Sequence, residues 1–570
     1  MIRLDNANIA ENYPGVCSPL TCSFAEETYR LVFARLAERL LPGRLPAVDE
    51  AVAAMAVGVE GRMYYRIDNW YRLLQFAPLR RWLIPVWQRS LAVTAADLPP
   101  RIAVGALTRL RVGWRFLVAW RRAPALMARL KDEFAQVARD FAERFDPSDP
   151  AGLRDLFGRI KSGVLRDWDI TLVNDLRAFV FTALAQRLRV DVRGADLESL
   201  RPARALAELR SRPDLDGLAG VDTDAAARAF LANKTALARA LADYIADFGD
   251  RVPGELKLET ETFRTAPLLL VRLLRDPTVP GGADGTVSAG ADGVSRARQA
   301  SDGSRADGML RSSRASDARS RRPRGVRGAV ADRAARAVEH RESSRLDRAR
   351  IYGMVRAIVL AQGSLLAGAG AVDDPADVFF LTLDEVMDGC PDPRGRVAER
   401  KADWAEYANR PERPRIEIDD PRALVADRPT ARAATGSDDD RPGASEIAAA
   451  SRGARAGRGE TRDVGGPLTG TPCSAGTVEA EVIVVSDPGV DARGKIVVAR
   501  ATDPGWVFLL SQAAGVVAER GSILSHTAIV CRELGVPAVV GVPDATRLLR
   551  TGDRVRLDAG AGRIEVLSRG

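Results

Sequence analysis

Two long polar segments constrain the fold of this 570-residue chain more than any other feature. Residues 276–335 are rich in Gly, Ser and Arg, and residues 421–463 are rich in Ala, Gly, Ser and charge. Segments with so few apolar residues cannot bury enough surface to fold by themselves. We therefore predict a disordered insertion at 276–335, a flexible linker at 421–463, and folded parts at 1–275, 336–420 and 464–570.

The first two folded parts have the apolar periodicity of helices. Ser23 and Glu26 form a capping-box pattern, and the apolar residues that follow recur every three or four positions. We expect further helices across 52–145 and 151–250, and a helix that resumes near residue 336. The stretch DVFFLTLDEV, residues 377–386, predicts a short strand and then a helix that Thr382 and Glu385 cap.

The last part changes character. Four β-branched runs, at 478–486, 495–500, 515–519 and 537–541, alternate with short helical patterns and precede a hairpin around Gly560. The predicted fold class is therefore multidomain, with a mostly α-helical N-terminal and central domain followed by a C-terminal α/β domain.

His526 is one of only two histidines, and it follows Ser525 at a predicted helix start. Free backbone N–H groups and the positive end of the helix dipole favour an anion there and disfavour an imidazolium. A neutral imidazole beside an anion site suits a phosphoryl-accepting nucleophile. From the local pattern alone, a helix-capping or core histidine and a general base remain open alternatives.

The residues around His526 resemble the phosphohistidine swivelling domain of phosphoenolpyruvate-utilising enzymes. The shared positions are Glu519, Gly521, Ser525, His526, Ala528, Ile529, Val530, Arg532, Glu533, Gly535, Pro537 and Gly541, while Ser522 replaces the second glycine of the pattern. The resemblance implies that His526 carries the phosphoryl group. It also implies that Glu519, Gly521, Ser525 and Thr527 support the phosphate site.

Segments of the helical part, such as ENYPGVCSPLTCSF, ITLVNDLRAF and HRESSRLDRARIYGMVR, resemble phosphoenolpyruvate synthase-like and rifampin-phosphotransferase-like proteins. By this resemblance, acceptor or phosphate contacts are expected from Asp250, Arg251, Lys257, Glu259, Arg341, Glu342, Arg345 and Arg348. A buried salt-bridge network that fixes the helices explains the same charges equally well. His340, next to this cluster, is predicted to be structural.

No Gly-rich phosphate loop occurs in the first 275 residues, and no GxxxxGK[ST] pattern occurs in the sequence. We therefore expect no cofactor on this chain alone, with ATP and Mg²⁺ held by a separate ATP-grasp subunit that phosphorylates His526. Phosphoenolpyruvate is the alternative donor. The expected acceptor is a hydroxyl or enol oxygen of a small molecule. A phosphate-relay or regulatory binding protein, and an inactive scaffold, are the alternative functions.

Composition argues against several other classes. The net charge of +8 comes from residues 291–350, which hold 16 Arg against 8 acidic residues, so we expect no nucleic-acid partner. No apolar run approaches the ~18 residues that a membrane span needs. Five cysteines without a CxxC pair, with two histidines, predict no metal site and a reducing cytoplasmic location.

Overall fold

The computed structural model describes most of the chain outside the two polar segments. The described residues are 2–6, 9–43, 45–76, 80, 84, 104–188, 190, 198–275, 325–418, 467–486, 490–502, 506–521 and 525–570. The predicted linker at 421–463, most of the predicted insertion and Ser522 lie outside them, and the predictions for those residues stay predictions.

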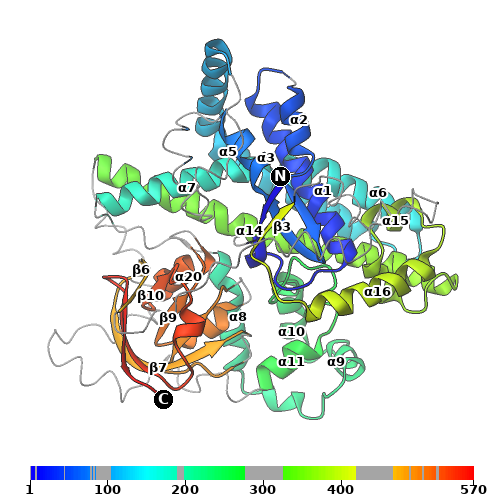
Figure 1. Cartoon of the computed structure of the whole chain (residues 1–570). Helices are drawn as coiled ribbons and strands as arrows, with labels where there is room; N and C mark the ends of the chain where they lie inside the picture. Colours follow the sequence, from blue (N-terminus) through cyan, green and yellow to red (C-terminus); the bar gives the residue numbers. More distant parts are fainter. Residues whose placement is uncertain are drawn as a thin grey trace.

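A helical body forms the larger part of the molecule (Figure 1). Its longest helix, α14, packs against α5, α6 and α7, so the two predicted helical parts share one core. The helices are α1 Pro19–Leu40, α2 Pro46–Val52, α3 Ile67–Leu74, α5 Ala106–Arg144, α6 Pro150–Ile160, α7 Asp169–Arg187, α8 Arg201–Arg210, α9 Asp224–Leu231, α10 Ala236–Phe248, α11 Leu268–Arg275, α14 Val326–Gly368, α15 Leu383–Asp388 and α16 Pro393–Asn409.

A four-stranded antiparallel sheet closes this body. Its order is β2-β3-β1-β4, with β1 Ile2–Asp5, β2 Ala56–Val59, β3 Arg62–Arg66 and β4 Arg415–Ile418. The prediction of helix throughout 52–145 is therefore wrong at β2 and β3. A two-residue turn joins these strands, with φ +48° at Glu60 and +67° at Gly61. Two positive φ angles in succession match the twist of a tight hairpin.

The capping pattern predicted at Ser23 is also wrong. Helix α1 begins at Pro19, and the side chain of Ser18 caps it by accepting the Thr21 N–H. Ser23 lies inside the helix and donates to the Pro19 carbonyl instead. Proline suits the first helical turn, where its missing N–H leaves no bond unmade, and it moves the start towards the N-terminus.

Two boundaries in the second helical part differ from the prediction. Helix α14 begins at Val326, ahead of the predicted start near residue 336 and inside the predicted insertion. Residues Pro375–Phe380 form a 3-10 helix and not the predicted strand, because Asp374 caps them through a complete capping box. The predicted capping box of Thr382 and Glu385 is confirmed at the start of α15.

The C-terminal domain is built on an eight-stranded sheet of order β5-β12-β11-β7-β8-β9-β10-β6. Its centre is parallel, from β7 through β8 and β9 to β10, and β11 and β12 form the predicted hairpin. The strands are β5 Leu468–Thr469, β6 Thr471–Ser474, β7 Thr477–Val485, β8 Ile496–Ala499, β9 Gly515–Ala518, β10 Ala538–Val540, β11 Arg554–Asp558 and β12 Arg563–Ser568; the helices are α19 Val507–Gln512, α20 His526–Leu534 and α21 Ala545–Leu548.

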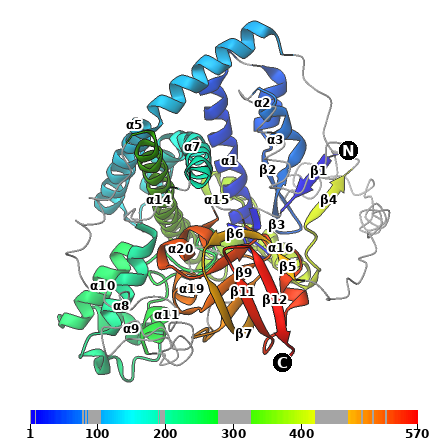
Figure 2. The ribbon, with the colours of Figure 1, turned by 90° about the vertical axis from the view of Figure 1, so that its left-hand side faces the viewer.

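The C-terminal domain rests on the helical body through α20 and its neighbours. Figure 2 shows α20 lying below α7 and α14. Ala178 of α7 and Ala337 and Val338 of α14 belong to the same buried apolar cluster as the residues of α20. An ion pair between Arg500 and Glu412 adds a polar contact between the two parts. The start of α20 is therefore buried against the helical body.

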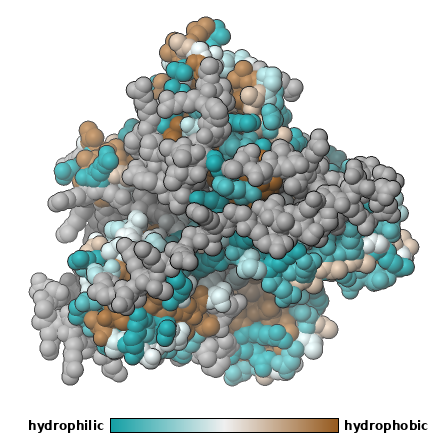
Figure 3. Space-filling view, in the orientation of Figure 1, coloured by the Kyte–Doolittle hydropathy of each residue, from teal (hydrophilic) through white to brown (hydrophobic). Residues whose placement is uncertain are grey.

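Among the described helices, α14 alone is long and apolar enough to cross a membrane by length and composition, and 61% of its most apolar window is buried. Such burial is what a helix at the centre of a core shows. Exposed large apolar residues include Leu107, Leu110 and Trp114 at the projecting end of α5. Hydrophobic side chains stand among hydrophilic ones at that end, at the top of Figure 3.

Candidate functional site

The start of α20 holds His526 in a fixed position. Ser525 is the cap residue, and its hydroxyl accepts the Ala528 N–H at 3.4 Å. Gly521 has φ +130°, and a Cβ there would lie 3.0 Å from the Ser525 hydroxyl oxygen. Gly535 ends the helix in the left-handed conformation, as predicted. Glycine at 521 therefore allows the chain to pass close to the residue that caps the histidine helix.

Loss of this cap has a predictable cost. We expect Ser525→Ala to lower the free energy of unfolding of the C-terminal domain by about 1 kcal/mol, because one buried N–H loses its acceptor. Chemical denaturation with and without the substitution measures the difference. Thr546→Ala, on the short helix α21, is the comparison variant, because it leaves the cap of α20 in place. An unchanged stability in Ser525→Ala would contradict the capping role.

His526 is 3% exposed and faces Glu342 of α14, which is fully buried. The His526 Nδ1 and Glu342 Oε2 atoms lie 3.7 Å apart, beyond hydrogen-bond length. Among the described residues, neither ring nitrogen has a hydrogen-bond partner, and Glu342 Oε2 has none either. Buried polar atoms in native proteins are almost always paired, so these three atoms can each take a hydrogen bond from water or from a bound group.

Three arginines lie near this pair, and a fourth, Arg348, lies near Arg345. Arg345 forms an ion pair with Glu342 at 3.5 Å, and Arg341 forms one with Asp175 of α7. Arg251 is 2% exposed and donates to Glu255 at 2.8 Å, while its Nε and one terminal nitrogen have no hydrogen-bond partner in the part of the chain that the structure describes. The fourth, Arg348, donates to Asn12. The site is thus cationic, and several of its donors are unused.

The charges at the site set the protonation of both central residues. Burial lowers the pKa of His526, and Arg251 and Arg345 lower it further, against the opposing effect of Glu342. Burial raises the pKa of Glu342, but Arg345 and His526 outweigh it and hold the pKa well below its usual range. Burial lowers the pKa of Arg345 to about 10. At neutral pH the imidazole is therefore neutral and the carboxylate is ionised.

A lowered His526 pKa predicts how stability depends on pH. In the unfolded chain the imidazole takes up its proton at a pKa of about 6.5, but in the folded chain it does so only at lower pH. The associated stability is fully present above about pH 6.5 and is lost as the pH falls towards the folded pKa. We expect the ring of His526 to titrate below pH 6.5 by NMR.

His340 is the other histidine whose ring gives NMR signals, and burial lowers its pKa as well. A His340→Gln variant leaves one histidine in the chain and makes the NMR assignment unambiguous. Titration of His526 at or above its ordinary pKa would contradict the desolvated, cationic surroundings described here.

The other predicted residues have different surroundings. The Asp250 carboxylate lies against α14 at Gly353, where a Cβ would come within 2.2 Å of its Cγ, and it pairs with Arg264 and Arg356. The side chains of Lys257 and Glu259 hold the start of α1: Lys257 donates to the Val16 carbonyl, and Glu259 accepts from Ser18 and Thr21.

The predicted phosphate-site residues on the C-terminal domain also have different partners. Thr527 is buried and shares a 2.6 Å hydrogen bond with Thr502. Glu519 accepts the backbone N–H of Thr546 at 2.7 Å, so it secures the start of α21. The structure therefore brings Arg251, Glu342 and Arg345 towards His526, with Arg341 beside Glu342. Arg348 binds Asn12 instead. Lys257 and Glu259 stabilise the helical body, and Glu519 stabilises the C-terminal domain.

The sequence prediction did not single out Glu11, Asn12 or Asp175. Glu11 is near Arg345, Arg341 and Arg520, and burial raises its pKa. Asn12 and Asp175 hold Arg348 and Arg341. All three stand inside the segments ENYPGVCSPLTCSF and ITLVNDLRAF, so those segments contained the signal that finds them.

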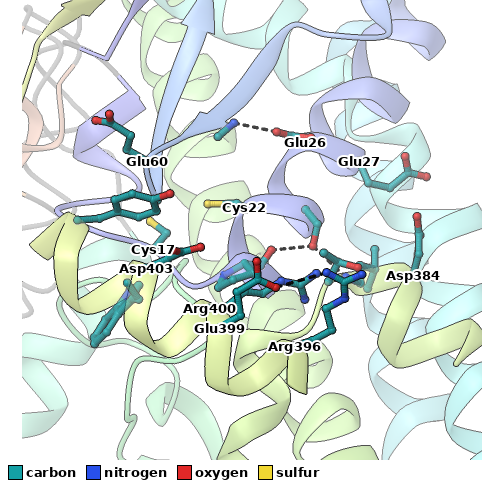
Figure 4. Close-up of a pocket in the computed structure, with 18 of the residues that line it drawn as sticks. Cys17, Cys22, Glu26, Glu27, Glu60, Asp384, Arg396, Glu399, Arg400 and Asp403 are labelled. Atoms are coloured by element: carbon teal, nitrogen blue, oxygen red, sulfur yellow. Dashed lines mark hydrogen bonds and ion pairs between the residues drawn. The ribbon is translucent and has the colours of Figure 1, made fainter. Parts of the chain in front are cut away.

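A separate cavity of about 280 Å³ lies between α1, the β2–β3 hairpin and α16 (Figure 4). Its lining includes Cys17, Cys22 and Glu60, and none of the predicted site residues. Several of its charges are neutralised by ion pairs, such as Arg30 with Glu27. In the described part of the chain, no group of three or more His, Cys, Asp or Glu side chains is placed to hold a metal ion.

Part of the C-terminal domain resembles a known protein family. Residues 491–562 match the family model described as the mobile domain of PEP-utilising enzymes. The chain is 30% identical over 338 residues to a rifampicin phosphotransferase of Streptomyces sviceus, covering 58% of this chain and 34% of that protein. It is 43% identical over 102 residues to a rifampicin phosphotransferase of Bacillus cereus, covering 18% and 12%.

A third relative is an uncharacterized protein of Mycobacterium tuberculosis, 33% identical over 241 residues that cover 42% of this chain and 24% of that protein. The chain spans about a third or less of the length of these curated relatives. Most of the C-terminal domain therefore resembles the mobile domain of PEP-utilising enzymes. Over these regions the chain is similar to PEP-utilising phosphotransferases.

Proposed function

We propose that His526 accepts a phosphoryl group and that the mobile domain delivers it to a small-molecule acceptor on the helical body. One observation carries the proposal: a neutral histidine at a helix start lies buried against Glu342 and a cluster of arginines with unused donors. A phosphoryl group on the ring supplies the anionic oxygens that such a cluster can bind.

Different roles for the two ring nitrogens are part of this proposal, because Glu342 Oε2 lies 3.7 Å from Nδ1. An Nδ1–H that points towards the carboxylate leaves the lone pair of Nε2 free to attack phosphorus. In the reverse half-reaction the P–Nε2 bond breaks and its electron pair returns to Nε2, while Nδ1 keeps its proton. The leaving group is then neutral imidazole and not the far more basic imidazolate, so Glu342 favours transfer in both directions.

The surrounding charges complete the transfer step. Arg251 and Arg345 stabilise the charge that develops on the phosphoryl oxygens. The acceptor hydroxyl forms the new O–P bond and loses a proton. Glu11 suits the role of general base, because burial raises its pKa towards the value that an efficient proton acceptor needs.

The donor side requires the domain to move. His526 is 3% exposed in the docked arrangement, so a donor reaches it only after the domain leaves the helical body. We propose that an ATP-grasp subunit, with ATP and Mg²⁺, phosphorylates His526 while the domain is undocked. The predicted linker at 421–463 is long and polar enough to permit such a movement, and tethering keeps the local concentration high at both stations.

Transfer from radiolabelled ATP tests this function. The chain is mixed with a separately produced ATP-grasp protein, Mg²⁺ and ATP labelled in its β-phosphate. We expect acid-labile label on the wild-type chain, none on His526→Ala, and release of the label when an acceptor is supplied. Label that never leaves the protein would favour a phosphate relay, and no label on the wild type would contradict the proposal.

A further inference from the structure

A second cavity, of about 460 Å³, lies between α5, α7 and α14. Guanidinium groups and aromatic rings dominate its wall. The charged or aromatic lining residues are Trp120, Arg121, Arg177, Phe181, Arg333 and Arg336. His340, predicted from the sequence to be structural, also lines this cavity.

The charge of the cavity is unbalanced. No Asp or Glu lines it, and the four arginines form no ion pair with any residue that the structure describes. Arg177 is 9% exposed; one terminal nitrogen donates to the Trp120 carbonyl, and its Nε has no hydrogen-bond partner among the described residues. Burial lowers the pKa of Arg177, and Arg333 and Arg336 lower it further. A buried cation without a counter-ion is costly, so this arrangement favours an anionic occupant.

The aromatic residues indicate the chemistry of the uncharged part of the occupant. The Arg177 guanidinium lies over the rings of Trp120 and Phe181, at 5.3 and 5.6 Å from their centres. The two rings are 5.9 Å apart and inclined at 45°. Leu117 and Pro124 extend the apolar wall. A flat apolar group stacks on such a surface, while its anionic substituent meets the arginines.

This cavity adjoins the His526 site through two helices. Asn174 of α7 lines the cavity and donates to the Ala337 carbonyl at 2.9 Å, and the next residue, Asp175, binds Arg341. On α14, His340 lines the cavity and Arg341 follows it directly. The lining of the cavity and the charge cluster near His526 therefore use neighbouring residues on both helices.

We propose that this cavity binds an aromatic anion, a planar ring system with a carboxylate or phosphate group, as the phosphoryl acceptor or the part of it that anchors it. The role as acceptor rests on the proposed function, whereas binding itself does not. As acceptor, the ring system also carries a hydroxyl: its oxygen forms the new O–P bond and its proton goes to a general base, while the P–Nε2 bond breaks and its electron pair returns to His526 as neutral imidazole.

Calorimetric titration of the full chain with matched probes tests the proposal. Hydroxynaphthoate carries the ring, the anion and a hydroxyl; naphthol lacks the anion; naphthylmethylamine reverses its charge. We expect hydroxynaphthoate to bind at least about tenfold more tightly than naphthol, and the amine not to bind. A tenfold change corresponds to about 1.4 kcal/mol, within reach of one charge-assisted contact.

The variant Arg333→Ala/Arg336→Ala removes two exposed arginines of the lining and should weaken hydroxynaphthoate about tenfold without changing naphthol. Arg327→Ala, exposed on the same helix, and Arg122→Ala, exposed beside Arg121, are the matched controls and should bind as wild type. Equal affinity for hydroxynaphthoate and naphthol, or equal losses in the controls, would overturn the proposal.

These titrations need no phosphoryl donor, so their failure is distinct from failure of the proposed function. Phosphohistidine that forms on a chain unable to bind hydroxynaphthoate would contradict only the aromatic-anion site. Hydroxynaphthoate that binds to a chain never phosphorylated at His526 would contradict only the phosphoryl carrier.

Discussion

Replacing His526 by alanine is expected to abolish phosphorylation of the chain and every later transfer, by at least about 10³-fold. No other side chain at the site combines a neutral nucleophilic nitrogen with the N-terminal end of a helix. His340, the second histidine, lines a different cavity and is not at a helix start. Measurement of acid-labile phosphate on each purified variant gives the result.

The same substitution should leave the fold intact. The imidazole makes no hydrogen bond with any described residue in the docked arrangement, so its removal leaves only the charge of Glu342 without its neighbour. His340→Ala is the matched control and should label as wild type. A large loss of thermal stability in His526→Ala, or equal labelling of the two variants, would return His526 to the role of a core histidine.

Glu342→Gln is expected to slow phosphoryl transfer by about 10²-fold, mainly in kcat, with the histidine still present. The amide keeps the size of the side chain but lacks the charge that favours a proton on Nδ1. Transfer would then release a more basic leaving group. Single-turnover rates with preformed phosphohistidine measure this step separately from binding of the acceptor.

Two further readouts separate this positioning role from a structural one. The NMR spectrum of the His526 ring should show more of the Nε2–H tautomer in Glu342→Gln than in wild type. Glu342→Ala should also cost about 3 kcal/mol of stability, since Arg345 loses its buried counter-charge. Glu339→Gln, exposed on the same helix, is the control. An unchanged tautomer together with an unchanged kcat would contradict the assignment.

The C-terminal domain could be predicted closely because its signals are local. β-Branched runs, Ser525 before His526 and Gly535 after the helix each specify their own conformation, and the structure has the strands and the helix at those places. The helical part depends more on contacts between distant segments. Strand β1 pairs with β4 at the other end of that part, and neither strand is long enough to show a periodic pattern.

At the candidate site, too, some features follow from local sequence and others from contacts between distant segments. His526 was identified from its neighbours in sequence, but the role of each charged residue depends on which helix faces it. Arg341 and Glu342 are adjacent in the chain, yet Arg341 pairs with Asp175 of α7 while Glu342 faces His526. Lys257 and Glu259 belong to the same predicted set and hold the start of α1. Sequence order alone does not separate these roles.

The arginine-rich composition concealed the second cavity for the same reason. In the sequence, Arg333 and Arg336 are indistinguishable from the general bias towards arginine. Their place in a cavity depends on α14 lying beside α5 and α7. Three helices from separate parts of the chain bring four cations around two aromatic rings.

The central claim is that His526 Nε2 carries a phosphoryl group, and its most direct test is to locate that group. The chain is phosphorylated with the ATP-grasp protein and ATP, kept at alkaline pH, and analysed by peptide mass spectrometry and phosphorus–proton NMR. We predict one acid-labile phosphoryl group, on the peptide that contains His526 and bonded to Nε2. Phosphate on Nδ1, on another residue, or on no residue under conditions that phosphorylate a rifampicin phosphotransferase would contradict the account.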